Sequence, residues 1–505
     1  MADYLQILGV LVALLLALYY YLGSSFDYWK NRGVVGPKPI PIFGNVKDVL
    51  LRKINLGDYV AQIYNEYKDE IMIGIFARVT PTVILRDMDL IKDVLIKDFS
   101  SFDDRGSNVF ERSDPLTANL FNLEPERWRP LRMRLSPVFT SGKLKDMFPL
   151  ILECAEHLEQ CLDKVAEKSE PIIECREIAA RYSTDVIGNC AFGINMNTLE
   201  NERSEFRRIG RKIFDQDFIL ALRFTLRESA PGIYGLLSYL LPQTEITTFL
   251  TKVISDTIKY REENNVVRPD FINMLMELKK HPDKLENIDL TDTLLTAQAF
   301  IFFAAGFETS STTIGHALYE LALNPSIQDK LREEMKEFST KNNGNLTYNV
   351  VKDMKYLDKV FKETLRKYPP AMFLRRKCNG NYTFSGTKVT ITKGTKLIIP
   401  VYGIQKDPNI YPNPDVFDPE RFNEDAEAAR HPMSFLPFGD GPRNCIGARF
   451  ALYQTKIGLI KMLENFRIDV CEKTMTSYVN NPKSLTLAPM GGIHLKISKV
   501  EKLLL

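Results

Sequence analysis

The feature that most constrains this chain is a glycine-rich bend around one cysteine, in the ten-residue segment Phe438–Gly447 (FGDGPRNCIG). A mostly apolar, helix-like run follows, so Cys445 stands just before an expected helix start. Backbone N–H groups and the helix dipole favour a thiolate there, the form of cysteine that ligates metal. Gly441 allows turn geometry and close approach to a large planar group, and Arg443 offers a partner for an anion on that ligand. A buried cysteine at a helix cap is the ordinary alternative, but this context is far more specific than a lone cysteine and glycine.

The composition is that of a large globular protein. The 505 residues are 45% hydrophobic and 26% charged, and no long Gly/Ser linker divides them, so one large domain is expected. A net charge of +2 gives no general case for nucleic-acid binding. The seven cysteines are scattered and form no zinc pattern, which argues against a disulfide framework and for a reducing compartment.

The N-terminal segment Leu5–Leu22 is almost wholly apolar and is close to the roughly 20 residues that span a bilayer. Asp3 precedes it, whereas Lys30 and Arg32 follow, so the positive-inside rule puts the main body in the cytoplasm. A cleaved signal peptide fits less well, because basic residues before the run and a clear cleavage site are missing. The expected divisions are an uncleaved membrane anchor over residues 1–24, a stiff Pro-rich hinge over 25–45 and a globular body over 46–505.

Apolar residues recur mostly at helical spacing between about residues 50 and 375. Helices are expected over 150–165, 250–261, 290–323 and 349–367, and strands near 71–75, 83–85, 387–392 and 395–400. The predicted fold class is therefore mainly α with small β-sheets. The apolar stretch 218–241 fits either buried core or a flap that touches a bilayer surface, and the sequence leaves both readings open.

A second chemical feature is the segment Ala304–Ser310 (AAGFETS), inside the long apolar helix expected from about residue 290. An acid and a hydroxyl are costly there unless they are hydrogen-bonded, and the Thr309 hydroxyl can bond to a carbonyl one turn earlier. Gly306 opens space beside the backbone. With Glu308 these residues fit a polar notch that holds a diatomic ligand and relays protons. A helix kink with a solvated glutamate is an equal alternative.

Three further patterns supply charged partners. Glu363 and Arg366 are three apart on one helix face, and Arg421, in a proline-rich loop, offers Glu363 a second partner. A weak surface ion pair is the ordinary alternative. Trp128 and Arg132 are four apart and can present an indole N–H and a guanidinium to one carboxylate, with the intervening proline expected in a first helical turn.

In chain order these motifs read WxxxR, AGxET, ExxR, PERF and FxxGxRxCxG. Their order and spacing resemble the cytochrome P-450 heme-thiolate monooxygenases, in detail the insect microsomal members of the detoxifying clan. The resemblance covers essentially the whole chain. It implies the cytochrome P-450 fold with an N-terminal transmembrane anchor helix, and residues 46–505 as the catalytic domain.

The resemblance assigns roles to residues by position. Cys445 matches the axial ligand of the heme iron, and Thr309 and Glu308 match the pair that delivers protons for oxygen activation. Further cofactor contacts are expected from Arg443, Trp128, Arg132, Arg105, Arg376, Phe438 and Gly447. A structural triad is expected from Glu363, Arg366 and Arg421. A distal substrate pocket is expected from Val109, Phe110, Leu120, Phe302, Ala305, Ala371, Met372 and Phe373.

The same resemblance implies the reaction and its partners. The cofactor is heme b (iron protoporphyrin IX), and NADPH supplies electrons through NADPH-cytochrome P-450 reductase, with cytochrome b5 as an additional donor. One oxygen atom of O2 enters a lipophilic substrate, whether a xenobiotic, plant toxin, insecticide or endogenous lipid or hormone. The enzyme is expected in the endoplasmic reticulum membrane, facing the cytoplasm. The basic residues Arg127, Arg129, Arg132 and Arg134 are candidates for docking the reductase.

Two other functions remain open at this point. One is a heme-thiolate isomerase or dehydratase that acts on peroxides without a reductase. The presence of Thr309 and Glu308 argues against it, since that chemistry needs no proton relay for dioxygen. The other is a non-catalytic, membrane-anchored heme or lipid carrier.

Overall fold

The computed structural model describes residues 23–201, 203–214, 218–240, 244–268, 270–280, 288 and 290–500, together with 4, 6–10 and 12–13. The anchor predicted over residues 1–24 falls largely outside these residues. Within the described part of the chain, no helix combines the length and the apolar character needed to cross a membrane.

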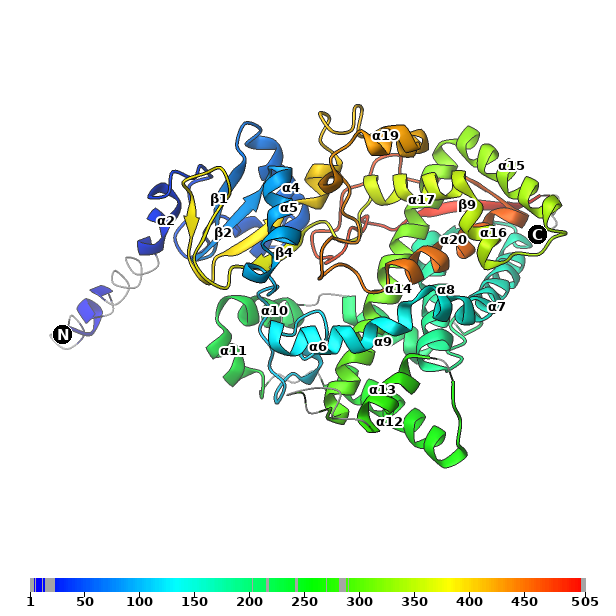
Figure 1. Ribbon diagram of the computed structural model, residues 1–505, viewed down its shortest axis with the longest axis horizontal. Coiled ribbons are helices and arrows are strands. Elements are labelled where there is room, and N and C mark those ends of the chain that lie inside the picture. The colour runs from blue at the N-terminus through cyan, green and yellow to red at the C-terminus, as the bar shows by residue number, and fades with distance from the viewer. Residues whose placement is uncertain are drawn as a thin grey trace.

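Helices make up most of the described chain, as the sequence predicted (Figure 1). The longer ones are α4 (Leu56–Glu66), α6 (Pro125–Leu135), α7 (Ser141–Ala166), α8 (Cys175–Ile187), α9 (Glu205–Phe214), α10 (Phe218–Ser229), α12 (Thr244–Asn264), α13 (Phe271–Lys280), α14 (Asp292–Leu323), α15 (Pro325–Lys341), α17 (Lys355–Lys367) and α20 (Ala448–Asn465). The shorter ones are α2 (Asp27–Lys30), α3 (Lys47–Leu50), α5 (Met88–Lys92), α11 (Pro231–Leu237), α16 (Tyr348–Asp353), α18 (Val401–Gln405) and α19 (Glu424–Ala428).

The strands of the described residues form three small sheets. The largest has the order β1 (Met72–Ala77), β2 (Thr80–Leu85), β7 (Lys396–Ile399) and β4 (Leu374–Lys377). The second has the order β3 (Ile172–Glu174), β9 (His494–Lys499) and β8 (Phe466–Asp469), and the third pairs β5 (Tyr382–Thr383) with β6 (Thr390–Ile391). Only β2 and β7 run parallel among these pairs, with Val83 opposite Leu397. In Figure 1 the four-stranded sheet lies beside the helical body, at the side where the chain begins.

The long helix α14 passes through the middle of the helical body and packs closely against α8 (Figure 1). The Thr291 hydroxyl caps its first turn by accepting the Leu294 N–H at 3.1 Å. Gly306 permits the close packing, since a Cβ there would lie 2.3 Å from Cδ1 of Ile187 on α8. The space that Gly306 leaves beside its backbone is therefore filled by α8. Apolar side chains of α7, α8, α14 and α20 form one large buried core around this contact.

Two local expectations were wrong. The helix expected over 349–367 is two helices, α16 and α17, because the backbone at Met354 is extended between them. The Glu334 carboxylate accepts the N–H groups of Tyr356 (2.7 Å) and Leu357 (2.9 Å) and so stabilises the separate start of α17. Pro130 does not lie in a first turn, because α6 begins at Pro125 and places Pro130 in the helix interior.

The apolar stretch that allowed two readings forms α10 and α11 in its described part. Tyr234 is buried, whereas the side chains of Leu236 and Leu240 are both 73% exposed. Ile219 and Ile233 are exposed as well. This stretch is therefore not simply core. Tyr234 packs into the protein, whereas several apolar side chains of the stretch are exposed on the surface.

Candidate active site

A cavity of about 530 Å³ lies between the middle of α14 and the bend that precedes α20. Residues of α6, α10 and β4 line the remaining sides. Its volume is in the usual range for sites that bind cofactors and small molecules. The cavity contains both chemical features singled out in the sequence, because Thr309 and Cys445 line it together.

Backbone geometry fixes the bend around Cys445. The Cys445 N–H donates to the Phe438 carbonyl at 2.8 Å, and this hydrogen bond closes the loop. Gly441 adopts φ +71°, and a Cβ there would lie 1.9 Å from the Leu95 carbonyl oxygen. Glycine is therefore required at 441 for conformation and for space. Gly447 stands at the start of α20 and lines the cavity, and a Cβ there would meet only Phe139, at 3.9 Å.

Opposing effects act on the Cys445 thiol, which is exposed to the cavity that it lines but has protein packed densely around it. Burial raises its pKa, and this effect is the largest. A hydrogen bond from the Gly447 backbone and the positive charges of Arg132 and Arg105 act in the opposite direction. The helix start and the basic neighbours thus favour the thiolate as expected, but they do not outweigh burial. Ligation to a cation would complete the deprotonation.

Four guanidinium groups gather around the same end of the cavity: Arg105, Arg132, Arg376 and Arg443. None of them forms an ion pair with a carboxylate among the described residues, although the charges of Asp103 and Asp104 partly oppose the lowering of the Arg443 pKa. Burial lowers the pKa of Arg376 and of Arg443 to about 10, and repulsion from Arg376 adds to the effect on Arg443. A concentration of positive charge without acidic partners is typical of a site that binds an anionic ligand.

Unpartnered polar atoms show where that ligand would bind. Arg443 is 2% exposed and donates from Nη2 to the Leu123 carbonyl at 2.9 Å, but its buried Nε and Nη1 have no hydrogen-bond partner among the described residues. The Nε of Arg376 is likewise buried without a hydrogen-bond partner among the described residues. The Arg443 guanidinium lies over the Trp128 ring at 4.1 Å, which fixes its orientation. These residues fit a planar cofactor with carboxylate groups, whose oxygens would accept the free N–H donors.

The α14 wall presents Thr309 to the cavity but directs Glu308 elsewhere. The Thr309 hydroxyl donates to the Ala305 carbonyl at 2.7 Å, the bond that the sequence predicted. Glu308 is buried and accepts from Arg176 Nη2 on α8 at 2.8 Å and from the Thr486 hydroxyl at 3.2 Å. The acid is therefore held by partners from two distant segments and is neither solvated nor among the cavity-lining residues.

Sequence reasoning missed Arg176 and Thr486. No local pattern marks either residue, since Arg176 is 132 positions from Glu308 and Thr486 is 178 positions from it. Only the packing of α8 and the C-terminal segment against α14 brings them together.

Most of the residues predicted for the substrate pocket line the cavity. They are Leu120, Phe302, Ala305, Ala371, Met372 and Phe373. Val109 and Phe110 lie outside it: Phe110 packs edge-on against Tyr234 of α11, with ring centroids 4.8 Å apart. Phe438 lines the cavity beside Cys445.

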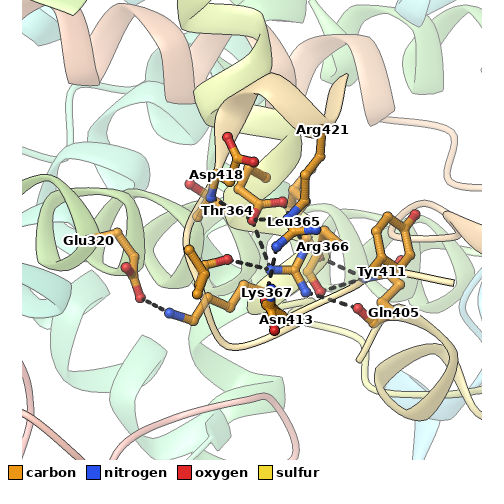
Figure 2. Close-up of polar contacts among 12 residues, drawn as sticks. Glu320, Thr364, Leu365, Arg366, Lys367, Gln405, Tyr411, Asn413, Asp418 and Arg421 are labelled. Atoms are coloured by element: carbon orange, nitrogen blue, oxygen red, sulfur yellow. Dashed lines mark hydrogen bonds and ion pairs between the residues drawn. The ribbon is translucent and has the colours of Figure 1, made fainter. Parts of the chain in front are cut away.

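The acid of the predicted triad, Glu363, is fully buried on α17. Arg366 donates to both carboxylate oxygens of Glu363, from Nε at 2.7 Å and from Nη2 at 2.8 Å, and both side chains are 0% exposed. Arg421 Nε lies 3.4 Å from Glu363 Oε1. Figure 2 shows Arg366 extending toward Gln405, whose carbonyl accepts from its Nη1 at 3.0 Å. The surface-pair alternative is therefore wrong.

Comparison with known proteins identifies the architecture. The family model described as "Cytochrome P450" matches residues 34–496. The chain belongs to the cytochrome P450 family. Cytochrome P450 6A1 of Musca domestica is 41% identical over 505 residues, covering 99% of this chain and 98% of the relative. Cytochrome P450 6a2 of Drosophila melanogaster is 39% identical over 503 residues, covering 97% and 99%. Cytochrome P450 6B1 of Papilio polyxenes is 39% identical, covering 98% and 99%.

Membership of the cytochrome P450 family gives the geometry its chemical meaning. The chain is a heme-thiolate monooxygenase, an oxidoreductase that uses a redox partner, O2 and an organic substrate. The residues of the cavity themselves fit a heme cofactor. A cysteine lies at one wall, and the guanidinium groups at one end form no ion pair with a carboxylate of the described residues.

Proposed function

We propose that the enzyme inserts one oxygen atom of O2 into lipophilic substrates, with heme b as cofactor and electrons from NADPH delivered by NADPH-cytochrome P-450 reductase. Cytochrome b5 is an additional electron donor in this proposal. The proposed location is the endoplasmic reticulum membrane, with residues 1–24 as anchor, 25–45 as hinge and residues 46–505 facing the cytoplasm as catalytic domain. Substrates are xenobiotics, plant toxins, insecticides or endogenous lipids and hormones. The apolar lining of the cavity supports this class.

One observation carries the proposal: a single cavity has a cysteine at the start of one helix and a hydroxyl on a second helix. Cys445 Sγ would ligate the heme iron, and the heme would supply the activation of dioxygen. Arg443, Arg376 and Trp128 would hold the carboxylate end of the cofactor, with Arg105 and Arg132 beside them. The polypeptide then provides orientation, charge and control of water.

The residues proposed for proton delivery are Thr309 and Glu308 of α14. Thr309 donates its hydroxyl proton to the Ala305 carbonyl in a hydrogen bond, and its oxygen remains available to accept a hydrogen bond from water in the cavity. Glu308 is the nearest acid in sequence, but it is bound to Arg176 and Thr486. To deliver protons to the cavity, Glu308 must exchange these partners for water, so Arg176 is the group that sets how often it does so.

The basic face of α6 supports docking of the reductase near the cofactor. Arg129 and Arg134 are exposed there. Arg127 is already paired with Glu111 at 2.9 Å and with Glu124, so its charge is locally matched. Arg132 donates to Asn444 within the cysteine bend and therefore serves the site itself. Arg129 and Arg134 are the better candidates for an acidic partner surface because their side chains are exposed, although Arg129 also lies 3.7 Å from Asp103.

The test combines a spectrum with turnover. We expect the reduced, carbon-monoxide-bound protein to show the Soret band of thiolate ligation, and Cys445→Ala to lose it. Persistence of that band in the variant would disprove the ligand assignment. Product formation that requires both reductase and NADPH would support the monooxygenase, whereas turnover of peroxides without reductase would indicate an isomerase or dehydratase. Binding without any product would indicate a carrier.

A further inference from the structure

A second positive region of the cavity lies on α10, apart from the group around Cys445. Arg227 lines the cavity, and its guanidinium lies 5.4 Å from the centroid of the Phe224 ring. Its Nε is buried without a hydrogen-bond partner, and within the described residues its side chain forms no ion pair. The backbone is held in place, because Asn108 Nδ2 donates to the Arg227 carbonyl at 3.0 Å.

The charges around Arg227 do not balance. Its neighbour Glu228 is bound on one oxygen by Arg375 Nη1 at 3.3 Å and by Lys396 Nζ at 3.1 Å. Burial raises the pKa of Glu228, but the nearby cations outweigh burial and leave the pKa lowered, so the group is ionised. Three cations thus face one carboxylate, and Arg227 is the one among them without a bound acid. The group is therefore net positive, and it can accept a further negative charge.

This region is separate from the cofactor end. The charges that act on Arg105 at the cofactor end come from Arg376, Arg443, Arg132 and Cys445. Arg227 instead acts on Glu228 and on Tyr234 of α11. Arg227 also belongs to α10, whereas the four arginines at the cofactor end belong to other segments, so a ligand held by Arg227 would contact the α10 side of the cavity.

We propose that Arg227 binds the carboxylate of the substrate, and that the enzyme accepts lipophilic carboxylic acids. The apolar part of such an acid extends along Phe302 and Ala305 toward Thr309. The inference rests on the proposed monooxygenase function. The reaction balances as R–H + O2 + 2 e⁻ + 2 H⁺ → R–OH + H2O: a C–H bond of the acid is replaced by C–O–H, and the redox partner supplies both electrons.

The test compares two ligands with the same chain and different head groups. Calorimetric titration of the heme-loaded protein should give dodecanoate a dissociation constant at least about tenfold lower than that of dodecan-1-ol, as expected for a charge-assisted hydrogen bond. Arg227→Gln should abolish this preference, and Arg227→Lys should restore part of it. Lys388→Gln is the matched control, since it removes one exposed positive charge from the β5–β6 hairpin. It should leave the preference unchanged.

Two outcomes would overturn the inference: equal affinity of the two ligands in the unaltered protein, or a preference for dodecanoate that survives in Arg227→Gln. Turnover separates this failure from failure of the proposed function. If dodecan-1-ol is oxygenated with reductase and NADPH while the acid has no advantage, only the inference is wrong. If neither compound yields an oxygenated product and the thiolate Soret band is missing, the proposed function is wrong as well. If the inference is correct, Arg227→Gln raises KM for dodecanoate by a larger factor than KM for dodecan-1-ol, and Lys388→Gln leaves kcat for dodecan-1-ol within about twofold.

Discussion

Replacing Glu363 by glutamine should destabilise the protein strongly, although the side chain keeps its shape. The carboxylate accepts two hydrogen bonds from Arg366 and one from the Asp418 backbone N–H at 2.9 Å, and neither Glu363 nor Arg366 has exposed surface. The amide leaves the buried guanidinium of Arg366 without a countercharge. Breaking one partner of a buried pair costs about 3–5 kcal/mol. The approach of Arg421 puts Glu363→Gln toward the upper end of that range.

The free energy of unfolding, measured by urea denaturation followed by circular dichroism, provides the assay. Glu337→Gln is the control: it removes the acid of an i,i+4 pair with Lys341, whose side chains are 61% and 63% exposed. We expect that control to lose no more than about 0.5 kcal/mol. Equal losses in the two variants, or a loss below about 1 kcal/mol in Glu363→Gln, would refute the argument that burial gives this pair its weight.

Three further changes test other parts of the structure. Burial lowers the pKa of His316 from 6.5 to about 3, so the unfolded chain binds more protons between those values and stability falls as pH falls. Acidification from about pH 7.5 to about 5.5 should cost about 1.4 kcal/mol through this residue, and His316→Phe should remove that part of the slope in urea denaturation. Gly441→Ala should lose heme, measured as absorbance per protein, because its Cβ would meet the Leu95 carbonyl and its φ is positive; full heme content would contradict this. Arg176→Gln should raise kcat, by up to about tenfold, with the Soret spectrum intact, because Glu308 no longer has to leave its ion pair before it exchanges protons with water, and Arg176→Lys should return kcat toward the unaltered value; an unchanged kcat would exclude Arg176 from proton delivery.

Elements with strong local signals could be predicted from the sequence. The apolar helical periodicity over 290–323 predicts α14, and the order of five motifs gives the family. Boundaries set by distant partners could not be predicted. The break at Met354 depends on Glu334, which lies in another helix and supplies the acceptors that α17 needs at its start.

The site residues likewise fall into two groups: those that local sequence spacing predicts and those that depend on distant partners. A spacing rule places Glu363 beside Arg366 because both lie on one helix, and a glycine at 441 follows from the needs of a tight bend. The partners of Glu308 follow no spacing rule, since they come from segments that meet α14 only after folding. Arg227 escapes sequence reasoning for a related reason: an arginine in an amphipathic helix normally faces solvent, and only the cavity shows that this one does not.

The guanidinium groups at the cofactor end link stability to cofactor binding. Burial lowers the pKa of Arg105 well below its usual value, and the charges of Arg376 and Arg443 lower it further. The folded chain therefore carries an electrostatic cost at this end, which a dianionic cofactor would relieve. Binding that relieves such a cost stabilises the folded state by an amount that grows with the logarithm of the affinity. It follows that the residues that hold the carboxylate groups of the heme also determine how much the heme stabilises the fold, so that Arg443 contributes to stability chiefly when the cofactor is bound.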